Sequence, residues 1–199
     1  RTELNNIQAK IFSCYMFDGE LNILGDKVEK LKIKHLEPDA IPYRKYYNVK
    51  KLEIKITTIK KEKVDEFLKS FPNLRELNIS SDFFISYKID QLPAKLEKLT
   101  TNLRLSPYLM RLPKRMIEAN IDVRYTNLPY VFRFSEIKRL NIITERVNNL
   151  PKNLDYLRME IPNNKIIKFK SNIKHLVLET SSSKIICPQG LEKLHIIGE

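Results

Sequence analysis

Three histidines and two cysteines are the side chains of this 199-residue chain best suited to bind a metal ion or transfer a proton. His175 and His195 lie 20 residues apart, and Glu160 and Glu179 recur at almost the same interval. A fold that stacks segments at this interval would place all four on one face, where a metal site or an acid–base pair is one interpretation. The simpler alternative, which we favour, is that they are solvated surface side chains, as is His35 in its run of lysines.

Cys14 and Cys187 lie near opposite ends of the chain, without the close spacing of a zinc site or a disulfide framework. We therefore predict two free thiols in a reducing compartment. No stretch reaches the roughly 18 consecutive apolar residues that a membrane span requires. The sequence thus predicts no transmembrane segment and a cytoplasmic location, with an excised N-terminal signal left open because the chain starts on Arg1.

Catalytic motifs are missing from the sequence. The only glycines are Gly19, Gly25, Gly190 and Gly198, which are too scattered to form a phosphate-binding loop or a dinucleotide fingerprint. A nucleophile elbow and a metalloprotease helix are also absent. We predict no catalytic residue, no metal, no cofactor and no enzymatic activity.

The charge of the chain is strongly basic. It carries 36 Lys and Arg against 24 Asp and Glu, a net charge of +12, and residues 27–63 contribute +7 of this excess. Such a balance favours an anionic ligand or an acidic protein surface as partner. Next to these lysines, residues 43–47 (YRKYY) interleave aromatic and charged side chains. They could stack on a partner, or, as we favour, pack against the fold.

An apolar pattern, Φ-x-x-Φ-x-Φ, recurs along the chain, for example in LRELNI (residues 74–79) and LDYLRM (residues 154–159). Copies follow one another at steps of 17 to 25 residues. Periodicity of this kind predicts a solenoid of stacked units that cannot bury their apolar faces alone. The middle apolar residues of the nine copies, called the marker positions below, are Leu31, Leu52, Leu77, Leu99, Ala119, Leu140, Leu157, Leu176 and Leu194.

A leucine-proline step often precedes the pattern, as in Leu92-Pro93 before Leu96 and Leu150-Pro151 before Leu154. This cadence resembles the leucine-rich repeat family, in its short L-P-x-x-L-x-x-L subtype found in amoebal FNIP-repeat proteins and bacterial LPX-type effectors. The resemblance covers residues 28–199. It implies an α/β solenoid with a parallel concave β-sheet of about nine strands, short irregular convex segments and few helices.

The chain departs from the family at the position where an asparagine usually bonds to the neighbouring turn. Leu36, Thr57, Asp82 and Arg104 are among the residues that stand there instead. The family's asparagine ladder is therefore not expected here. Stacking of the units does not depend on it.

The array is expected to span residues 28–199, preceded by an N-terminal cap at 1–27 that is helical or extended. One helix is predicted on the convex side, where Val64, Phe67, Leu68 and Phe71 follow a helical spacing. No polar-faced final unit closes the array at its C-terminus. Either neighbouring residues cap it or the parent protein continues.

The family resemblance implies recognition of a protein on the concave sheet, whose outward positions follow from the alternation of side chains in a strand. Lysines at the N-terminal end would meet acidic residues of that partner. Ile143, Val177 and Ile197, with Tyr156, would supply an apolar patch. The predicted partner-binding residues are Lys30, Lys32, Lys34, Lys51, Lys55, Lys98, Arg139, Tyr156, Arg158, His175 and His195.

Two alternatives belong to other classes of function. The basic end could bind an anionic ligand such as RNA, the ribosome or a phosphoinositide. The resemblance to LPX-type effectors implies, alternatively, a substrate-recognition domain of a larger enzyme such as a ubiquitin ligase. Recognition of a protein partner is the leading hypothesis, and these two are its alternatives.

Overall fold

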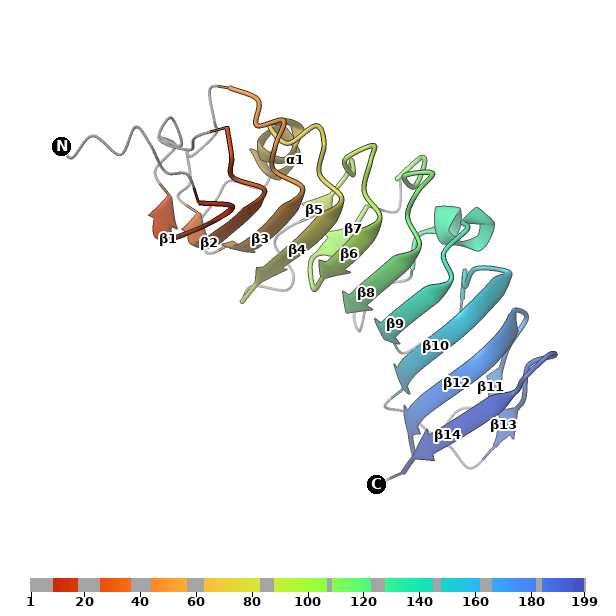
Figure 1. Ribbon diagram of the computed structural model, residues 1–199. Helices are drawn as coiled ribbons and strands as arrows, with labels where there is room; N and C mark the ends of the chain where they lie inside the picture. The colour runs from red at the N-terminus through yellow and green to blue at the C-terminus, as the bar shows by residue number, and fades with distance from the viewer. Residues whose placement is uncertain are drawn as a thin grey trace.

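The computed structural model describes residues 9–17, 26–36, 44–56, 63–82, 88–106, 109–122, 128–144, 148–161, 166–181 and 184–198. One parallel sheet dominates the molecule (Figure 1). Its ten strands, in spatial order, are β1 (Ile11–Phe17), β2 (Lys30–Leu36), β3 (Lys51–Ile56), β4 (Glu76–Ser81), β6 (Lys98–Thr101), β8 (Glu118–Asp122), β9 (Arg139–Ile143), β10 (Asn153–Ile161), β12 (Asn172–Thr180) and β14 (Lys193–Ile197).

The segments that return from one strand to the next contain little regular structure. Among the described residues they hold one seven-residue α-helix, α1 (Lys63–Lys69), and one 3-10 helix, η2 (Tyr130–Phe134). They also form two small parallel sheets, β5 (Lys88–Ile89) with β7 (Arg104–Leu105), and β11 (Ile167–Lys168) with β13 (Ile185–Ile186). The described residues therefore form a parallel β-solenoid with a single long sheet and almost no helix.

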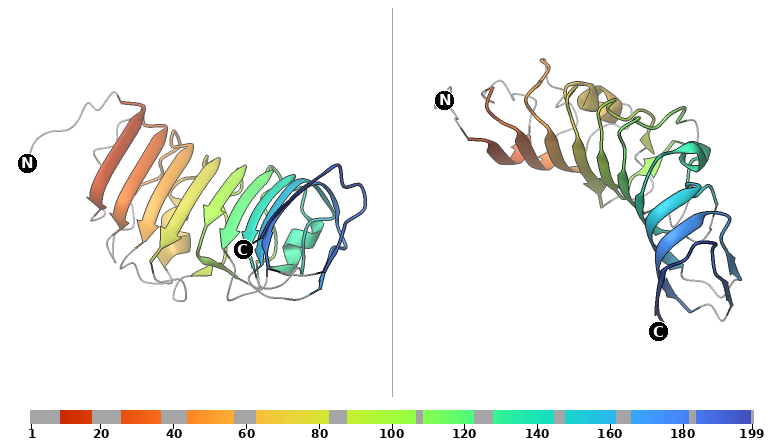
Figure 2. Two further views of the ribbon diagram at one scale, coloured as in Figure 1. Left: turned by 90° about the horizontal axis from the view of Figure 1, so that it is seen from below. Right: turned by 45° about the vertical axis from the view of Figure 1, so that its right-hand side comes forward.

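The array is curved. Figure 1 and the right-hand view of Figure 2 place β1 and β14 at opposite ends of the curved array. In Figure 1 the main sheet follows the inner side of the bend, and α1, η2 and the small sheets lie on the other side. No helix among the described residues is long and apolar enough to cross a membrane.

The nine marker positions lie side by side across the sheet, as their spacing predicts. Each pairs in register with the next, from Leu31 with Leu52 through to Leu176 with Leu194. Phe12 extends the row by one residue at the N-terminal end, where it pairs with Leu31. The sheet has ten strands rather than about nine because residues 11–17, which we placed in the cap, are extended and pair with β2.

Apolar side chains from the marker row and its neighbours form one continuous core. Leu31, Leu99 and Leu157 are fully buried, as expected for side chains that stack on the same position of both adjacent strands. The predicted helix is α1, and its Phe67 packs against Phe71 with ring centroids 5.2 Å apart. This helix closes the core on the outer side at the longest step of the repeat.

The proline steps form turns that lead into the strands. The backbone N–H of Leu96 donates to the carbonyl of Pro93 (3.1 Å), and that of Met116 donates to the carbonyl of Pro113 (3.0 Å). Each turn reverses the chain just before the strand begins. The leucine-proline step is thus a structural feature of the repeat.

Candidate recognition face

Side chains of the main sheet that point away from the core form what we call the open face. Strand register arranges them in rows, because equivalent positions of neighbouring strands lie next to each other. The first row is Lys30, Lys51, Glu76, Lys98, Glu118, Arg139, Tyr156, His175 and Lys193. The second row is Lys32, Glu53, Asn78, Thr100, Asn120, Asn141, Arg158, Val177 and His195.

A third row lies nearer the C-terminal ends of the strands. From β4 to β14 it contains Ser80, Asn102, Asp122, Ile143, Glu160, Glu179 and Ile197. Lys55 precedes it on β3, and Lys34 lies on β2. All eleven residues predicted to bind a partner therefore belong to the open face, although they are spread along its whole length.

Most lysines at the N-terminal end are ion-paired with an acidic residue from the adjacent strand or its end. The ammonium of Lys32 lies 2.9 Å from Glu53, that of Lys51 lies 3.0 Å from Glu76, and that of Lys55 lies 3.0 Å from Asp82. Lys98 is 3.7 Å from Glu118, and Lys34 lies over the ring of Tyr15. Instead of a cluster of repelling charges, this end of the face is a ladder of exposed ion pairs. Lys30 forms no ion pair with a described residue.

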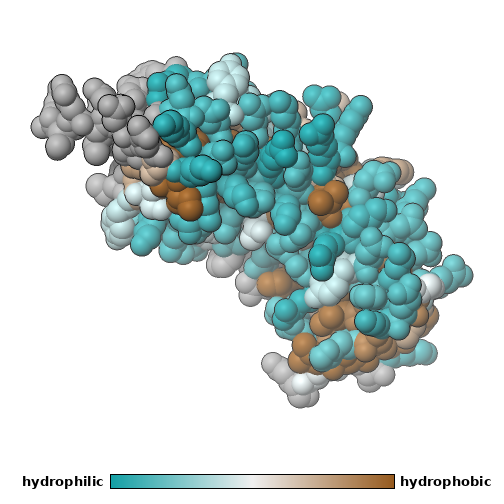
Figure 3. All heavy atoms as spheres, in the orientation of Figure 1, coloured by the Kyte–Doolittle hydropathy of each residue, from teal (hydrophilic) through white to brown (hydrophobic). Residues whose placement is uncertain are grey.

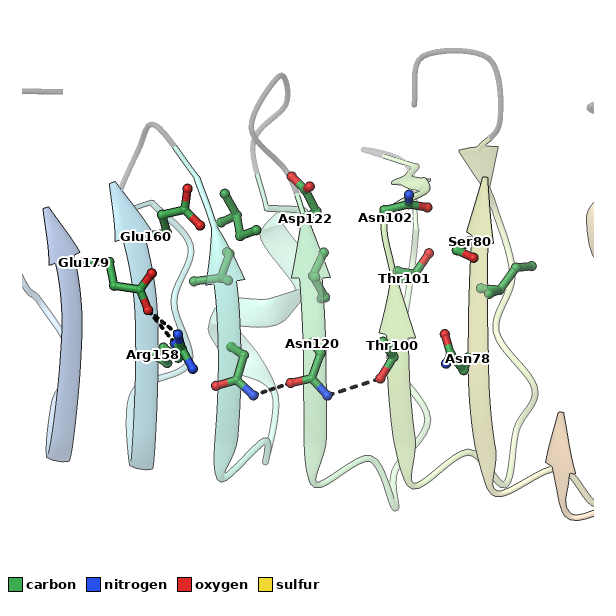
Figure 4. A pocket seen from close by; sticks show the side chains of 15 residues that line it. Asn78, Ser80, Thr100, Thr101, Asn102, Asn120, Asp122, Arg158, Glu160 and Glu179 are labelled. Atoms are coloured by element: carbon green, nitrogen blue, oxygen red, sulfur yellow. Dashed lines mark hydrogen bonds and ion pairs between the residues drawn. The ribbon is translucent and has the colours of Figure 1, made fainter. Parts of the chain in front are cut away.

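An amide row occupies the middle of the open face. Nδ2 of Asn120 donates to Oγ1 of Thr100 (3.1 Å), and Nδ2 of Asn141 donates to Oδ1 of Asn120. Figure 4 shows these two bonds running across the strands, with Asn78 next in the same row. Each amide fixes the orientation of the next because donor and acceptor must alternate.

A hollow of about 440 Å³ lies over this part of the sheet, from β4 to β12. We call it the amide hollow, because the amide row and Asn102 line it together with four charged side chains. Three of those are carboxylates, Asp122, Glu160 and Glu179, and one is the guanidinium of Arg158. The hollow is thus net negative, in a chain whose net charge is +12.

Arg158 and Glu179 form an ion pair in the hollow, and Figure 4 shows their side chains turned toward each other. Both Nε (2.8 Å) and Nη2 of Arg158 donate to Oε1 of Glu179. These hydrogen bonds and the charge of Glu179 raise the pKa of the Arg158 guanidinium. Arg158 therefore keeps its charge over the whole physiological range of pH.

One hydrogen-bond acceptor in the hollow is unused. Oδ1 of Asn141 is buried and accepts no hydrogen bond from any described residue. A buried polar atom without a partner costs free energy, of the order of 1 to 3 kcal/mol. Because the atom has almost no exposed surface, a ligand donor would recover that cost only if the Asn141 amide turned on binding.

The histidines lie on adjacent strands, as their spacing predicts. His175 pairs with Lys193, and His195 pairs with Val177, so the two rings occupy different rows. Nε2 of His175 lies 3.5 Å from Glu192. The described residues contain no group of three His, Cys, Asp or Glu that could hold a metal ion. Neither Cys14 nor Cys187 forms a disulfide with a described residue, and Sγ of Cys14 lies 3.7 Å from the carbonyl oxygen of Lys32.

The aromatic residues of the stretch 43–47 were expected either to stack on a partner or to pack against the fold, and the described ones do not all behave alike. Tyr43 lies outside the described residues. Tyr46 is buried and stacks on Phe71 at 5.6 Å, with the guanidinium of Arg44 5.1 Å from its ring, and burial raises the pKa of its phenol. Tyr47 is exposed. Tyr46 thus belongs to the core, as we favoured.

Apolar side chains gather at the C-terminal end of the array, where Figure 3 shows the largest hydrophobic area of that view. Of the residues predicted to form an apolar patch, Ile197 of β14 lies here and is 43% exposed. Glu160 and Glu179 separate it from Ile143 in the third row. Its exposed apolar neighbours on β14 are Leu194 and Ile196, which continue the buried rows yet remain 43% and 49% exposed.

Sequence reasoning did not identify the amide row and did not include it among the partner-binding residues. Asn78, Thr100, Asn120 and Asn141 fall on the same outward position of four successive copies. Aligning the copies would have shown this run of neutral polar side chains.

Comparison with protein-family models, curated proteins and solved structures finds no match to this chain.

Proposed function

We propose that the chain is a leucine-rich repeat array of the short L-P-x-x-L-x-x-L type and that it acts without catalysis, by binding a protein on its open face. The observation that carries the proposal is the amide hollow. It combines a hydrogen-bonded amide row with carboxylates and an unused buried acceptor, which together suit a polar, donor-rich ligand.

The size of the open face favours a protein segment as the ligand. Its first two rows of side chains cross nine parallel strands, from β2 to β14, and the amide hollow alone extends over β4 to β12. An extended segment lying along the rows would expose its backbone N–H groups and side chains to them. We expect backbone or side-chain donors of this segment to reach Asn141, and a basic side chain to lie among Asp122, Glu160 and Glu179.

The ion pairs limit what the lysines can add to this interaction. An acidic residue of the partner that approaches Lys32 or Lys51 would replace Glu53 or Glu76, so one exposed ion pair is exchanged for another. Exposed pairs contribute about 0 to 1 kcal/mol each. The lysines would therefore set orientation and rate of association more than affinity.

Selection from a displayed random-peptide library tests the proposal. Peptides are selected on the wild-type protein, then measured on a variant with Asn120→Ala, Asn141→Ala and Arg158→Ala. A matched control carries Gln91→Ala, Gln189→Ala and Arg115→Ala, three exposed side chains of the same kinds outside the open face. We expect the first variant to weaken binding by about tenfold or more, ~1.4 kcal/mol, and the control to bind as wild type does.

A second comparison separates the hollow from the lysine end. Replacing Lys30, Lys32, Lys51 and Lys55 with Gln should slow association and reduce affinity by less than the hollow variant does. Failure to enrich any peptide, or enriched peptides that bind the hollow variant and the control equally well, would contradict recognition on the open face.

A further inference from the structure

A second hollow, of about 580 Å³, lies where β10 and β12 begin. Its walls come from η2, from the link that leads into β10, and from the chain between β11 and β12. Four basic side chains line it: Arg133, Lys152, Lys168 and Lys170. We call it the basic hollow. It is separate from the amide hollow, with which it shares no lining residue.

The basic hollow is uncompensated in charge. Its lining contains no carboxylate, and its four basic side chains form no ion pair with any described residue. The open face differs, since its Lys32, Lys51 and Lys98 lie beside carboxylates of the neighbouring strand. Four like charges around one hollow repel each other, and a bound anion would relieve this repulsion.

Hydrogen bonds hold the walls of the hollow in place. Asn149 has a left-handed backbone (φ 60°), a conformation that asparagine tolerates better than most residues, and its Nδ2 donates to the carbonyl of Leu128 at 2.7 Å. The backbone N–H of Asn172 donates to the carbonyl of Lys152 (2.8 Å), and its Nδ2 donates to Oδ1 of Asn153 (3.1 Å). The backbone around Lys152 is therefore held in place before a ligand arrives.

We propose that the basic hollow binds a compact, multiply phosphorylated small molecule. Ammonium and guanidinium groups form charge-assisted hydrogen bonds with phosphate oxygens. The lining asparagines can bond to hydroxyl groups between the phosphates, because an amide both donates and accepts. The volume lies within the range of roughly 300 to 1,000 Å³ typical of small-molecule sites.

A nucleic-acid strand fits this site less well. Proteins that bind single strands stack bases on aromatic side chains, and the lining of the basic hollow contains none. The same phosphate chemistry could come from a free polyol phosphate or from a phosphoinositide headgroup in a membrane. This inference does not rest on the function proposed for the open face, because the two hollows have no residue in common.

Isothermal titration calorimetry with inositol hexakisphosphate on the full chain tests the site. The site variant carries Arg133→Gln, Lys152→Gln, Lys168→Gln and Lys170→Gln. The control carries Lys27→Gln, Lys45→Gln, Lys114→Gln and Arg115→Gln, which are exposed and lower the net charge equally. Thermal melting confirms that both variants fold. We expect micromolar binding by the wild type, a loss of roughly 100-fold in the site variant, and a change below about twofold in the control.

Two further arms identify the source of the phosphate. Cosedimentation with phosphatidylcholine vesicles containing a phosphatidylinositol bisphosphate shows whether a lipid headgroup is accepted, and a single-stranded RNA of mixed sequence is titrated in parallel. Binding of the free polyphosphate alone assigns a soluble ligand, whereas binding of both assigns the headgroup as a further source. The proposal is overturned if the wild type does not bind either phosphate probe, if the control loses as much affinity as the site variant, or if RNA binds more tightly through the same four residues.

Discussion

Asp65 and Asp155 lie in opposite electrostatic environments. Asp65, in the first turn of α1, accepts hydrogen bonds from the backbone N–H groups of Asp90 and Gln91, both at 3.3 Å. Burial nevertheless raises its pKa above the ordinary value of 3.8, against the effect of these bonds. Asp155 is exposed on β10, and its hydrogen bond with Lys174 (3.0 Å) lowers its pKa below that value.

These shifts predict opposite effects of pH on stability. Since folded Asp65 binds its proton more tightly than the unfolded chain does, its contribution to the free energy of unfolding falls as pH rises from 3.8 through its folded pKa. The contribution of Asp155 is present above 3.8 and is lost as pH falls through its folded pKa. Urea unfolding of Asp65→Asn and Asp155→Asn from about pH 2 to 6 should give difference curves of opposite slope relative to wild type. Parallel curves for the two variants would contradict this assignment.

At the scale of the strands, the contribution of a marker residue to the free energy of unfolding depends on whether strands cover it on both sides. Leu157 of β10 is fully buried between the equivalent leucines of β9 and β12, whereas Leu194 of β14 has only Leu176 beside it. We expect Leu157→Ala to lower the free energy of unfolding by about 2 to 5 kcal/mol. Leu194→Ala should cost below about 1 kcal/mol, because much of its side chain already contacts water. If urea titrations showed that both substitutions lower the free energy of unfolding equally, the prediction would be contradicted, and β14 would have to be covered in solution.

The strands could be predicted from the sequence, and their return segments could not. Leu31 to Leu194 recur because each strand must place an apolar side chain on the same stack, so periodicity alone fixes the register. The outward rows followed from that register. The ion pairs within them could also have been predicted, since Lys32 and Glu53 occupy the same position of successive copies. The basic hollow could not be predicted this way. Its basic side chains, among them Arg133, Lys152 and Lys168, lie on segments that share no sequence pattern. They come together only because of the path that the chain takes between the strands.

Over the whole molecule, the sheet couples its strands only to their neighbours. Each internal strand of the ten-stranded sheet pairs with two others, and β14 pairs with β12 alone. Stability in such an array is close to a sum of local terms, so regions can open separately. Leu194 and Ile196 leave β14 with the least buried apolar surface of the C-terminal strands, while Leu176 and Leu178 of β12 are buried.

Amide hydrogen exchange tests this description across the whole array. In the wild type we expect the amides of β14 to exchange at least about 100-fold faster than those of β10, because opening β14 exposes little additional apolar surface. Replacing the buried Leu176 with Ala should accelerate exchange in β10 and β14, which contact β12, far more than in β3, which does not. The matched variant Leu52→Ala, in β3, should reverse this order. Equal acceleration of all strands by both variants would mean that the molecule unfolds as one cooperative unit, and the nearest-neighbour description would then be wrong.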